Sequence, residues 1–358
     1  MWSAKLGRMG TTKSRPRLTT WYGTWPPRPS QYGCQTGSIR TRTAWVAASP
    51  MNQNLGQQRP CQAEHLASAP RRATTTTRSS STSTLPPVGI SHTITEPTAN
   101  NHIATITLSN PLKLNIVTTP LLHALTSTLR SLSSQPTLRC LILTSSPTSQ
   151  SKPPSFIGGA DISEMHALTT PASAQTFIRN IHDTCAGIRT FPVPVIARIH
   201  GLCLGAGLEL AASCDLRIAS EISTFGMPEV AVGIPSVVEA ALLPGLIGTG
   251  RTRRLVYLAE RIDAKEAERW GLVERVVDGG EVELDAAVKE WTDRLGQMGP
   301  QAIRAQKELC RGWEQAGGVE EAVEMGIEAY GRMWEDGGSE PREFMGRFVN
   351  RKRGKKGD

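Results

Sequence analysis

The 358-residue sequence predicts an α/β fold with a helical region at its C-terminal end and a disordered leader at its N-terminal end. Three observations predict this organisation. Short strand patterns alternate with helical patterns over residues 89–277, which is typical of an α/β core. Only helical periodicity follows, over residues 278–358. Residues 1–88 lack sustained apolar periodicity, so they cannot bury enough surface to offset their chain entropy.

The leader is the source of the chain's basic character. It holds twelve Lys or Arg and one acid, whereas the other 270 residues hold 28 Lys or Arg against 31 Asp or Glu. Its Arg-rich, Ser-rich and acid-poor composition is typical of a mitochondrial transit peptide. A disordered extension, or a later start at Met51, fits the same composition. Peroxisome and cytosol stay as alternative compartments, although the final residues Lys356-Gly357-Asp358 do not resemble a peroxisomal address.

The cysteines and the apolar stretches exclude several classes of protein. Seven cysteines without a C-x-x-C pair indicate a reducing compartment, without a disulfide framework or a zinc site. The longest apolar stretch, residues 230–248, is interrupted by Pro235, Glu239 and Pro244. A bilayer span needs about 20 predominantly apolar residues, so we expect no transmembrane helix.

The elements of the core follow from local patterns. Residues 102–108 alternate as a strand that stops at Asn110-Pro111. Residues 120–132 place Leu at helical spacing behind a proline. Further strands are predicted at 138–144, 193–200 and 215–219, and further helices at 172–190, 239–246, 252–258, 283–295, 300–313 and 319–333, with another helix that opens at Gly205. The basic tail around residues 352–356 is expected to be a solvated end.

Two glycine-marked turns could bring a backbone N–H close to a ligand. Gly158-Gly159 follow a strand and have no Cβ to block the approach, although a turn that only needs positive φ would look the same. Gly205-Ala206-Gly207 lead a strand into a helix, whose free N–H groups and dipole suit a developing anion. A dinucleotide site is disfavoured at these glycines because Leu occupies position 210, where the third glycine belongs.

Two glutamates add acid/base chemistry to these turns. Glu209 lies in the first turn of the helix, where it could simply complement the dipole. Its Leu and Ala neighbours predict a buried carboxyl group with a raised pKa, which indicates function more than stability. Glu229 follows Pro228 in an apolar stretch. Glu239 is expected to lie on a solvated helix face.

Taken together, these segments resemble the enoyl-CoA hydratase/isomerase family, the crotonase superfamily. The resemblance covers about residues 90–340. Five ordered motifs carry it: Asn110-Pro111 with Asn115, Phe156 to Ile162, Pro192 to Ala211, Phe225 to Glu229, and Ala264 to Val273.

The resemblance implies a ββα spiral core of the ClpP/crotonase type over residues 89–277, followed by a helical trimerisation region and basic tail over 278–358. It implies an acyl-CoA substrate, a homotrimer or hexamer, and neither metal nor other cofactor. The implied roles are an oxyanion hole at the backbone N–H groups of Gly158 and Ala206, acid/base catalysis by Glu209 and Glu229, and CoA binding by Lys113, Ala160, Asp161, Ile162 and Lys307.

The implied activity is reversible hydration of a trans-2-enoyl-CoA. Two glutamates favour hydration, since an isomerase can shuttle its proton with Glu229 alone. Residues 236–245 replace the family's usual glycine-rich run, so an isomerase, or a branched-acyl-CoA hydratase of siderophore or polyketide-type metabolism, stays as an alternative. An RNA-binding or scaffold protein on the same fold is the alternative of another class, motivated by the leader's charge of +11. The slightly acidic remainder argues against a nucleic-acid partner.

Overall fold

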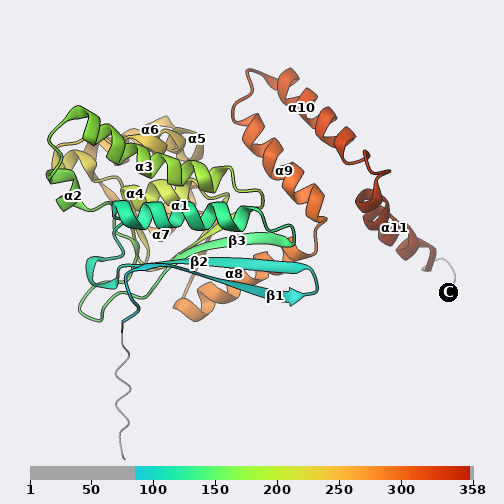
Figure 1. Cartoon of the computed structure of the whole chain (residues 1–358), viewed down its shortest axis with the longest axis horizontal. Coiled ribbons are helices and arrows are strands. Elements are labelled where there is room, and N and C mark those ends of the chain that lie inside the picture. Colours follow the sequence, from blue (N-terminus) through green and yellow to red (C-terminus); the bar gives the residue numbers. More distant parts are fainter. Residues whose placement is uncertain (1–84, 355–358) are drawn as a thin grey trace, which may run out of the picture. The chain divides into compact units, whose positions relative to one another are not determined.

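The computed structural model describes residues 85–354. The predicted leader, residues 1–88, therefore lies outside the described residues apart from its last four positions. Two sheets and the helices that cover them confirm the α/β class (Figure 1). Among the described residues, no helix is long and apolar enough to cross a bilayer.

The larger sheet has six strands in the order β1-β2-β3-β5-β7-β10. Strands β1 and β2 are antiparallel, and every later pair is parallel. The predicted strands at 102–108, 138–144, 193–200 and 215–219 are confirmed as β2, β3, β5 and β7, whereas β1 and β10 were not predicted. The strands are β1 Gly89–Thr98, β2 Asn101–Ser109, β3 Leu138–Ser145, β5 Val195–Ile199, β7 Leu216–Ser220 and β10 Arg275–Val277.

The smaller sheet positions the candidate site. It consists of four three-residue strands in the order β4-β6-β8-β9: Ser155–Ile157, Leu202–Leu204, Thr224–Gly226 and Arg261–Asp263. Strands β4, β6 and β8 are parallel, so their carboxyl ends meet at one edge. The chain leaves these ends at Gly158, Gly205 and Met227, and ligands of parallel sheets bind at such an edge.

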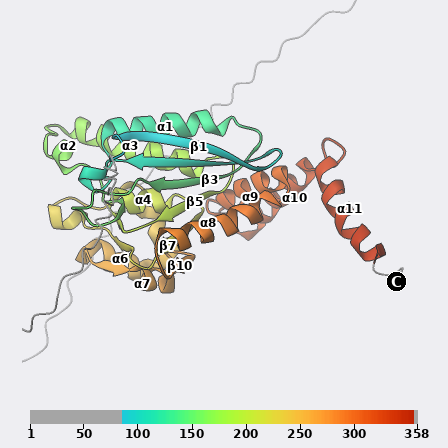
Figure 2. The ribbon, with the colours of Figure 1, turned by 90° about the horizontal axis from the view of Figure 1, so that it is seen from below.

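Helices cover both faces of the larger sheet. On one face lie α1 (Thr119–Ser133) and α3 (Pro171–Arg189), which pack side by side (Figure 1). Both helices begin at a threonine cap. The side chain of Thr118 accepts a hydrogen bond from the N–H of Leu121, and that of Thr170 accepts one from the N–H of Ser173. On the other face, α8 (Glu281–Gly296) buries Leu284 against the sheet, on the opposite side from α1 (Figure 2).

The short helices are α2 (Ile162–His166), α4 (Ala206–Ala212), α5 (Leu243–Ile247), α6 (Thr249–Leu258) and α7 (Ala264–Trp270). The described residues also form three 3₁₀ helices: η1 (Pro111–Lys113), η2 (Glu229–Val232) and η3 (Val238–Leu242). The prediction of one helix over residues 239–246 is wrong, because η3 and α5 divide this segment. Pro244 is tolerated there because it lies in the first turn of α5, where a helix needs no backbone N–H.

The chain is helical after β10. The predictions for 283–295, 300–313 and 319–333 are confirmed by α8, α9 (Pro300–Trp313) and α10 (Val319–Arg332). A last helix, α11 (Ser339–Gly354), takes in the start of the basic tail, where we expected only a solvated end.

Candidate active site

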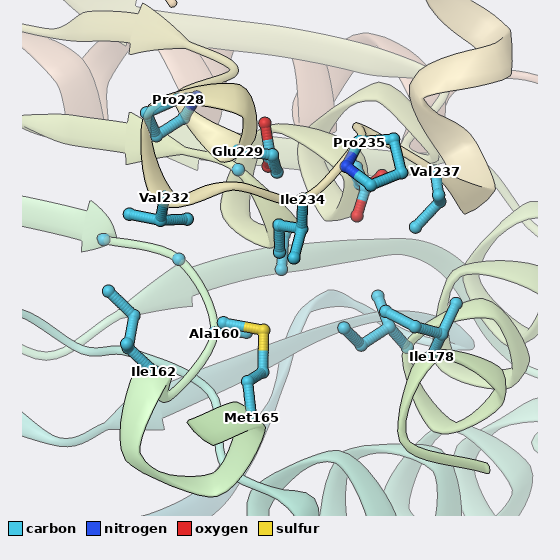
Figure 3. Close-up of a pocket in the computed structure, with 16 residues that line it drawn as sticks. Ala160, Ile162, Met165, Ile178, Pro228, Glu229, Val232, Ile234, Pro235 and Val237 are labelled. Atoms are coloured by element: carbon cyan, nitrogen blue, oxygen red, sulfur yellow. The ribbon is translucent and has the colours of Figure 1, made fainter. Parts of the chain in front are cut away.

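One apolar pocket lies at the carboxyl edge of the smaller sheet (Figure 3). Its walls come from the turn after β4, from α2, α3 and the start of α4, and from the segment after β8. Glu209 and Glu229 are its only acidic lining residues. The full lining is Gly158, Gly159, Ala160, Ile162, Met165, Ile178, Ile181, Gly205, Ala206, Glu209, Pro228, Glu229, Val232, Ile234, Pro235 and Val237.

The structure corrects one of the two predicted oxyanion-hole donors. Gly158 lines the pocket, but its N–H donates to the carbonyl of Leu114 at 3.0 Å and is not available to a ligand. Two residues further on, Ala160 also lines the pocket. The carbonyl of Gly159 accepts a hydrogen bond from the N–H of Val117, and the N–H of Asp161 donates to the carbonyl of Val117, both at 2.9 Å. The N–H of Ala160 between them has no acceptor within residues 85–354.

The second predicted donor fits the geometry. Ala206 is the first residue of α4, so its N–H has no intrahelical partner, and none of the described residues accepts it. Gly205 precedes it with φ of 52°, a conformation that glycine adopts at little cost. The pocket therefore contains two backbone N–H groups, those of Ala160 and Ala206, that are free to bind an anionic oxygen.

Glu209 projects into the pocket from α4, and its side chain is buried. Its Oε1 accepts the backbone N–H of Ala240 at 3.3 Å. Burial raises the pKa of Glu209 to about 8, and the nearby charges of Glu229 and Glu239 act in the same direction, against the hydrogen bond from Ala240. Glu209 is therefore protonated at neutral pH, as the apolar neighbours in the sequence suggested.

Glu229 lines the same pocket from a different element. It begins η2 after Pro228, and its Oε2 accepts the hydroxyl of Ser236 at 2.8 Å. Its Oε1 lies close to Gly205, where an added Cβ would come within 2.7 Å of that oxygen. The structure thus brings both predicted glutamates into one cavity, together with the two free N–H groups.

Glu239 corrects another prediction. We expected a solvated face, but the residue is only 3% exposed. It lies on η3, which packs between α3 and α4, and its Oε1 is 2.9 Å from Nδ1 of His182 on α3. Its Oε2 has no hydrogen-bond partner among the described residues. The sequence held no signal for His182, because its partner lies 57 positions away.

The residues predicted to bind CoA divide into three groups. Ala160 and Ile162 line the pocket, with Ile162 58% exposed at its rim. Asp161 does not line it, because its carboxylate caps α2 through the N–H of Ser163 at 2.8 Å. Lys113 lies beside this turn, bonded to Asp161 at 3.1 Å, and its side chain is largely exposed.

Lys307 forms the third group, and the structure places it apart from the pocket lining. Its ammonium is buried and donates to Asp215 at 2.7 Å and to the carbonyls of Val193 and Ile188 at 3.0 and 3.4 Å. An ammonium has three N–H donors, so the chain itself uses all of them. We therefore correct the predicted contact with CoA and assign Lys307 to the attachment of α9 to the core.

No cluster of three or more His, Cys, Asp or Glu that could hold a metal ion is present in the part of the chain that the structure describes. Five cysteines in the described part of the chain are free: Cys310 is exposed, and the other four, Cys140, Cys185, Cys203 and Cys214, are buried. Burial raises the pKa of each of these four thiols, which leaves them as unreactive packing groups.

Comparison with known proteins gives concordant results. Residues 98–336 match the family described as enoyl-CoA hydratase/isomerase. A putative enoyl-CoA hydratase/isomerase of Bacillus subtilis is 35% identical over 209 residues, covering 58% of this chain and 77% of that protein. A short-chain-enoyl-CoA hydratase of Clostridium acetobutylicum is 30% identical, covering 70% of this chain and 92% of that protein.

Comparison of structures agrees. The crystal structure of an enoyl-CoA hydratase from Bacillus anthracis superposes with a TM-score of 0.60 at 31% identity, covering 67% of this chain and 89% of that chain. The likeness confirms the predicted fold of the core.

Proposed function

Because this chain belongs to the enoyl-CoA hydratase/isomerase family, we propose that it is an enoyl-CoA hydratase, which adds water reversibly to a trans-2-enoyl-CoA and gives the 3-hydroxyacyl-CoA. One observation carries the proposal: Glu209, Glu229 and two unbonded backbone N–H groups share a single apolar pocket. Hydration needs each of these groups.

The N–H groups of Ala160 and Ala206 bind the thioester oxygen in this proposal. Attack of water at Cβ moves negative charge onto that oxygen and gives an enolate. Two fixed donors in a mostly apolar pocket stabilise the enolate more than the uncharged thioester, and each donor contributes about 10²- to 10³-fold in rate. Ala160 replaces Gly158 in this role, because the N–H of Gly158 already bonds to Leu114.

Glu209 and Glu229 supply the proton transfers. Addition of water needs a base, which removes a proton from the attacking water, and an acid, which delivers a proton to Cα. The raised pKa of Glu209 keeps a proton on this glutamate at neutral pH, so Glu209 is the acid in this proposal and Glu229 is the base. The hydroxyl of Ser236 donates to Glu229 and holds that carboxylate at the pocket.

The CoA portion lies at the Ile162 rim of the pocket in this proposal. Ile162 is exposed there, and Lys113 adds an exposed positive charge beside it for the phosphates of CoA. Asp161 acts indirectly, since it caps α2 and holds Lys113. The predicted homotrimer or hexamer and the mitochondrial address stay predictions.

Isomerisation of a 3-enoyl-CoA is the second candidate activity. It needs one carboxylate to move a proton between two carbons, and Glu229 alone supplies that. The presence of Glu209 in the same pocket favours hydration. A hydratase of branched acyl-CoA is also compatible with the replaced segment at residues 236–245.

The test is a panel of linear, branched and 3-unsaturated enoyl-CoA thioesters, with identification of each product. We expect hydration of crotonyl-CoA, and a loss of about 10²- to 10⁴-fold in both Glu209→Gln and Glu229→Gln. Glu335→Gln changes an exposed glutamate outside the pocket and serves as the matched control. Full activity in either pocket variant would refute the role of that glutamate, and products of isomerisation alone would favour the second candidate.

A further inference from the structure

A second apolar hollow adjoins the candidate active site. It is a groove between α3 and the start of η3, lined by Ala174, Gln175, Ile178, Arg179, His182, Val237 and Val238. Ile178 and Val237 also line the active-site pocket, so these two side chains have the pocket on one side and the groove on the other. They form the wall between two apolar spaces.

The wall lies at the end of the pocket opposite the CoA rim. Figure 3 shows Val237 and Ile178 facing each other at one end, whereas Ile162 and Val232 lie at the other end and Glu229 lies between them. If the thioester oxygen binds at Ala160 and the CoA portion leaves past Ile162, the acyl chain extends towards the wall.

The backbone next to Val237 is strained. Val238 has φ of 43°, a backbone conformation that is unfavourable for a β-branched residue. Two tertiary contacts of the residues directly after it hold it there: Glu239 bonds to His182 at 2.9 Å, and the N–H of Ala240 donates to Glu209 at 3.3 Å. The strain and these two bonds fix where Val237 can lie.

From this geometry we infer that Ile178 and Val237 set the upper limit of acyl-chain length, and that the groove beyond them is an apolar extension of the site which a longer chain enters only when the wall is cut back. The inference rests on the proposed function. It deepens that function by naming the substrate class as short linear acyl chains. Valine and isoleucine are β-branched and have few χ1 rotamers, so the side chains of this wall do not rotate out of the way of a longer acyl chain.

The experiment measures kcat/KM for trans-2-enoyl-CoA thioesters with acyl chains of 4 to 16 carbons. The wild-type chain should prefer the short substrates. Val237→Ala should raise kcat/KM for the 12-carbon substrate relative to the 4-carbon substrate by about 10-fold or more. The double variant with Ile178→Ala should raise this ratio further. One methylene in an apolar pocket changes discrimination between substrates by about 10- to 200-fold.

Val232→Ala is the matched control, because it removes the same side chain from the opposite end of the pocket and should leave this ratio unchanged. Val237→Phe tests the reverse direction, since it thickens the wall and should reduce kcat/KM for the 6-carbon substrate more than for the 4-carbon one. An unchanged ratio in both wall variants would overturn the inference, as would a wild-type chain that accepts 12-carbon and 4-carbon substrates equally.

A binding measurement separates this inference from the proposed function. Calorimetry with saturated acyl-CoA thioesters of 4 and 12 carbons needs no turnover. If the wild-type chain hydrates and isomerises no enoyl-CoA, the proposed function fails. The wall is then still supported if Val237→Ala tightens binding of the 12-carbon ligand relative to the 4-carbon ligand by about 10-fold, and overturned if the relative affinity does not change.

Discussion

Glu209 is the residue whose surroundings shape the chemistry of the pocket most directly. It is buried in an apolar helix and has two further acids near it, Glu229 and Glu239. Each of these features disfavours the ionised form. A single hydrogen bond from Ala240 opposes them. The outcome is a glutamate that keeps its proton at neutral pH and can donate it during turnover.

The pH dependence of activity follows from the pKa of about 8 for Glu209. A site that needs one protonated carboxyl group loses activity when that group ionises, so kcat/KM should decline as the pH rises above about 8. The measurement is a pH profile of crotonyl-CoA hydration from pH 5 to 10. Activity that still rises at pH 9.5 would contradict the assignment of the proton to Glu209.

Glu239 gives a second prediction at this scale, because its charge raises the pKa of Glu209. Glu239→Gln removes that charge, so ionisation of Glu209 becomes easier and the alkaline limb of the profile should move to lower pH. Glu221→Gln changes an exposed glutamate outside the pocket and should leave the limb in place. A shift to higher pH, or none, would show that Glu239 serves only to hold η3 through His182.

The sequence predicted the reacting residues better than their surroundings. Glu209, Glu229 and Ala206 lie in local motifs, and the structure brings them together. Gly158 was wrongly predicted as a donor because its N–H bonds to Leu114, 44 positions earlier, and local sequence does not reveal such a partner. The burial of Glu239 likewise depends on how η3 packs between α3 and α4.

At the scale of elements, the turn from β6 into α4 decides how close the two glutamates come. Gly205 occupies this turn with φ of 52°, and its Cα lies against the carboxyl group of Glu229. A side chain here would need both a left-handed backbone and the space that Glu229 occupies. The glycine therefore serves the fold and the site together.

Gly205→Ala tests this dependence. The added Cβ would lie 2.7 Å from Oε1 of Glu229, so the carboxyl group must move, and a backbone at φ 52° and ψ −124° costs a residue with a side chain about 1–3 kcal/mol. We expect a loss of at least about 10-fold in kcat and a lower free energy of unfolding. Gly250→Ala is the matched control, since it lies in α6 with nothing within 4 Å and should be neutral or slightly stabilising. Unchanged kcat in Gly205→Ala would refute the close approach.

Element length explains many of the elements that could be predicted, but not the ten-residue strand β1, which was missed and is mostly exposed. The longer strands β2 and β3 and the helices α1, α3, α9 and α10 carry several turns or alternations, and their patterns were readable. Strands β4, β6, β8 and β9 have three residues each, too few to show a period. The smaller sheet was therefore not predicted, although the turns that carry Ala160, Ala206 and Glu229 follow its strands.

At the scale of the whole described chain, polar contacts attach α9 to the α/β core. Arg304 on α9 donates to the carbonyls of Gln135, Pro136 and Leu138 at 3.0 to 3.2 Å. Lys307 on the same helix reaches Asp215, whose carboxylate also accepts the N–H of Val195. The contact joins α9 to the start of β5 and β7, strands that lead towards the active-site turns.

Lys307→Met distinguishes attachment of α9 from CoA binding. Removal of the lysine leaves the carboxylate of Asp215 partly without a partner. We expect a loss of about 2–3 kcal/mol in the free energy of unfolding. The loss is smaller than for a fully buried pair because Asp215 is one-third exposed. The KM for crotonyl-CoA should change by less than about twofold at temperatures where the variant is folded. Lys289→Met, at an exposed pair on α8, is the matched control and should alter neither quantity. A raised KM at unchanged unfolding free energy would return Lys307 to the CoA site, because a residue that only binds ligand leaves the stability of the unliganded chain as it is.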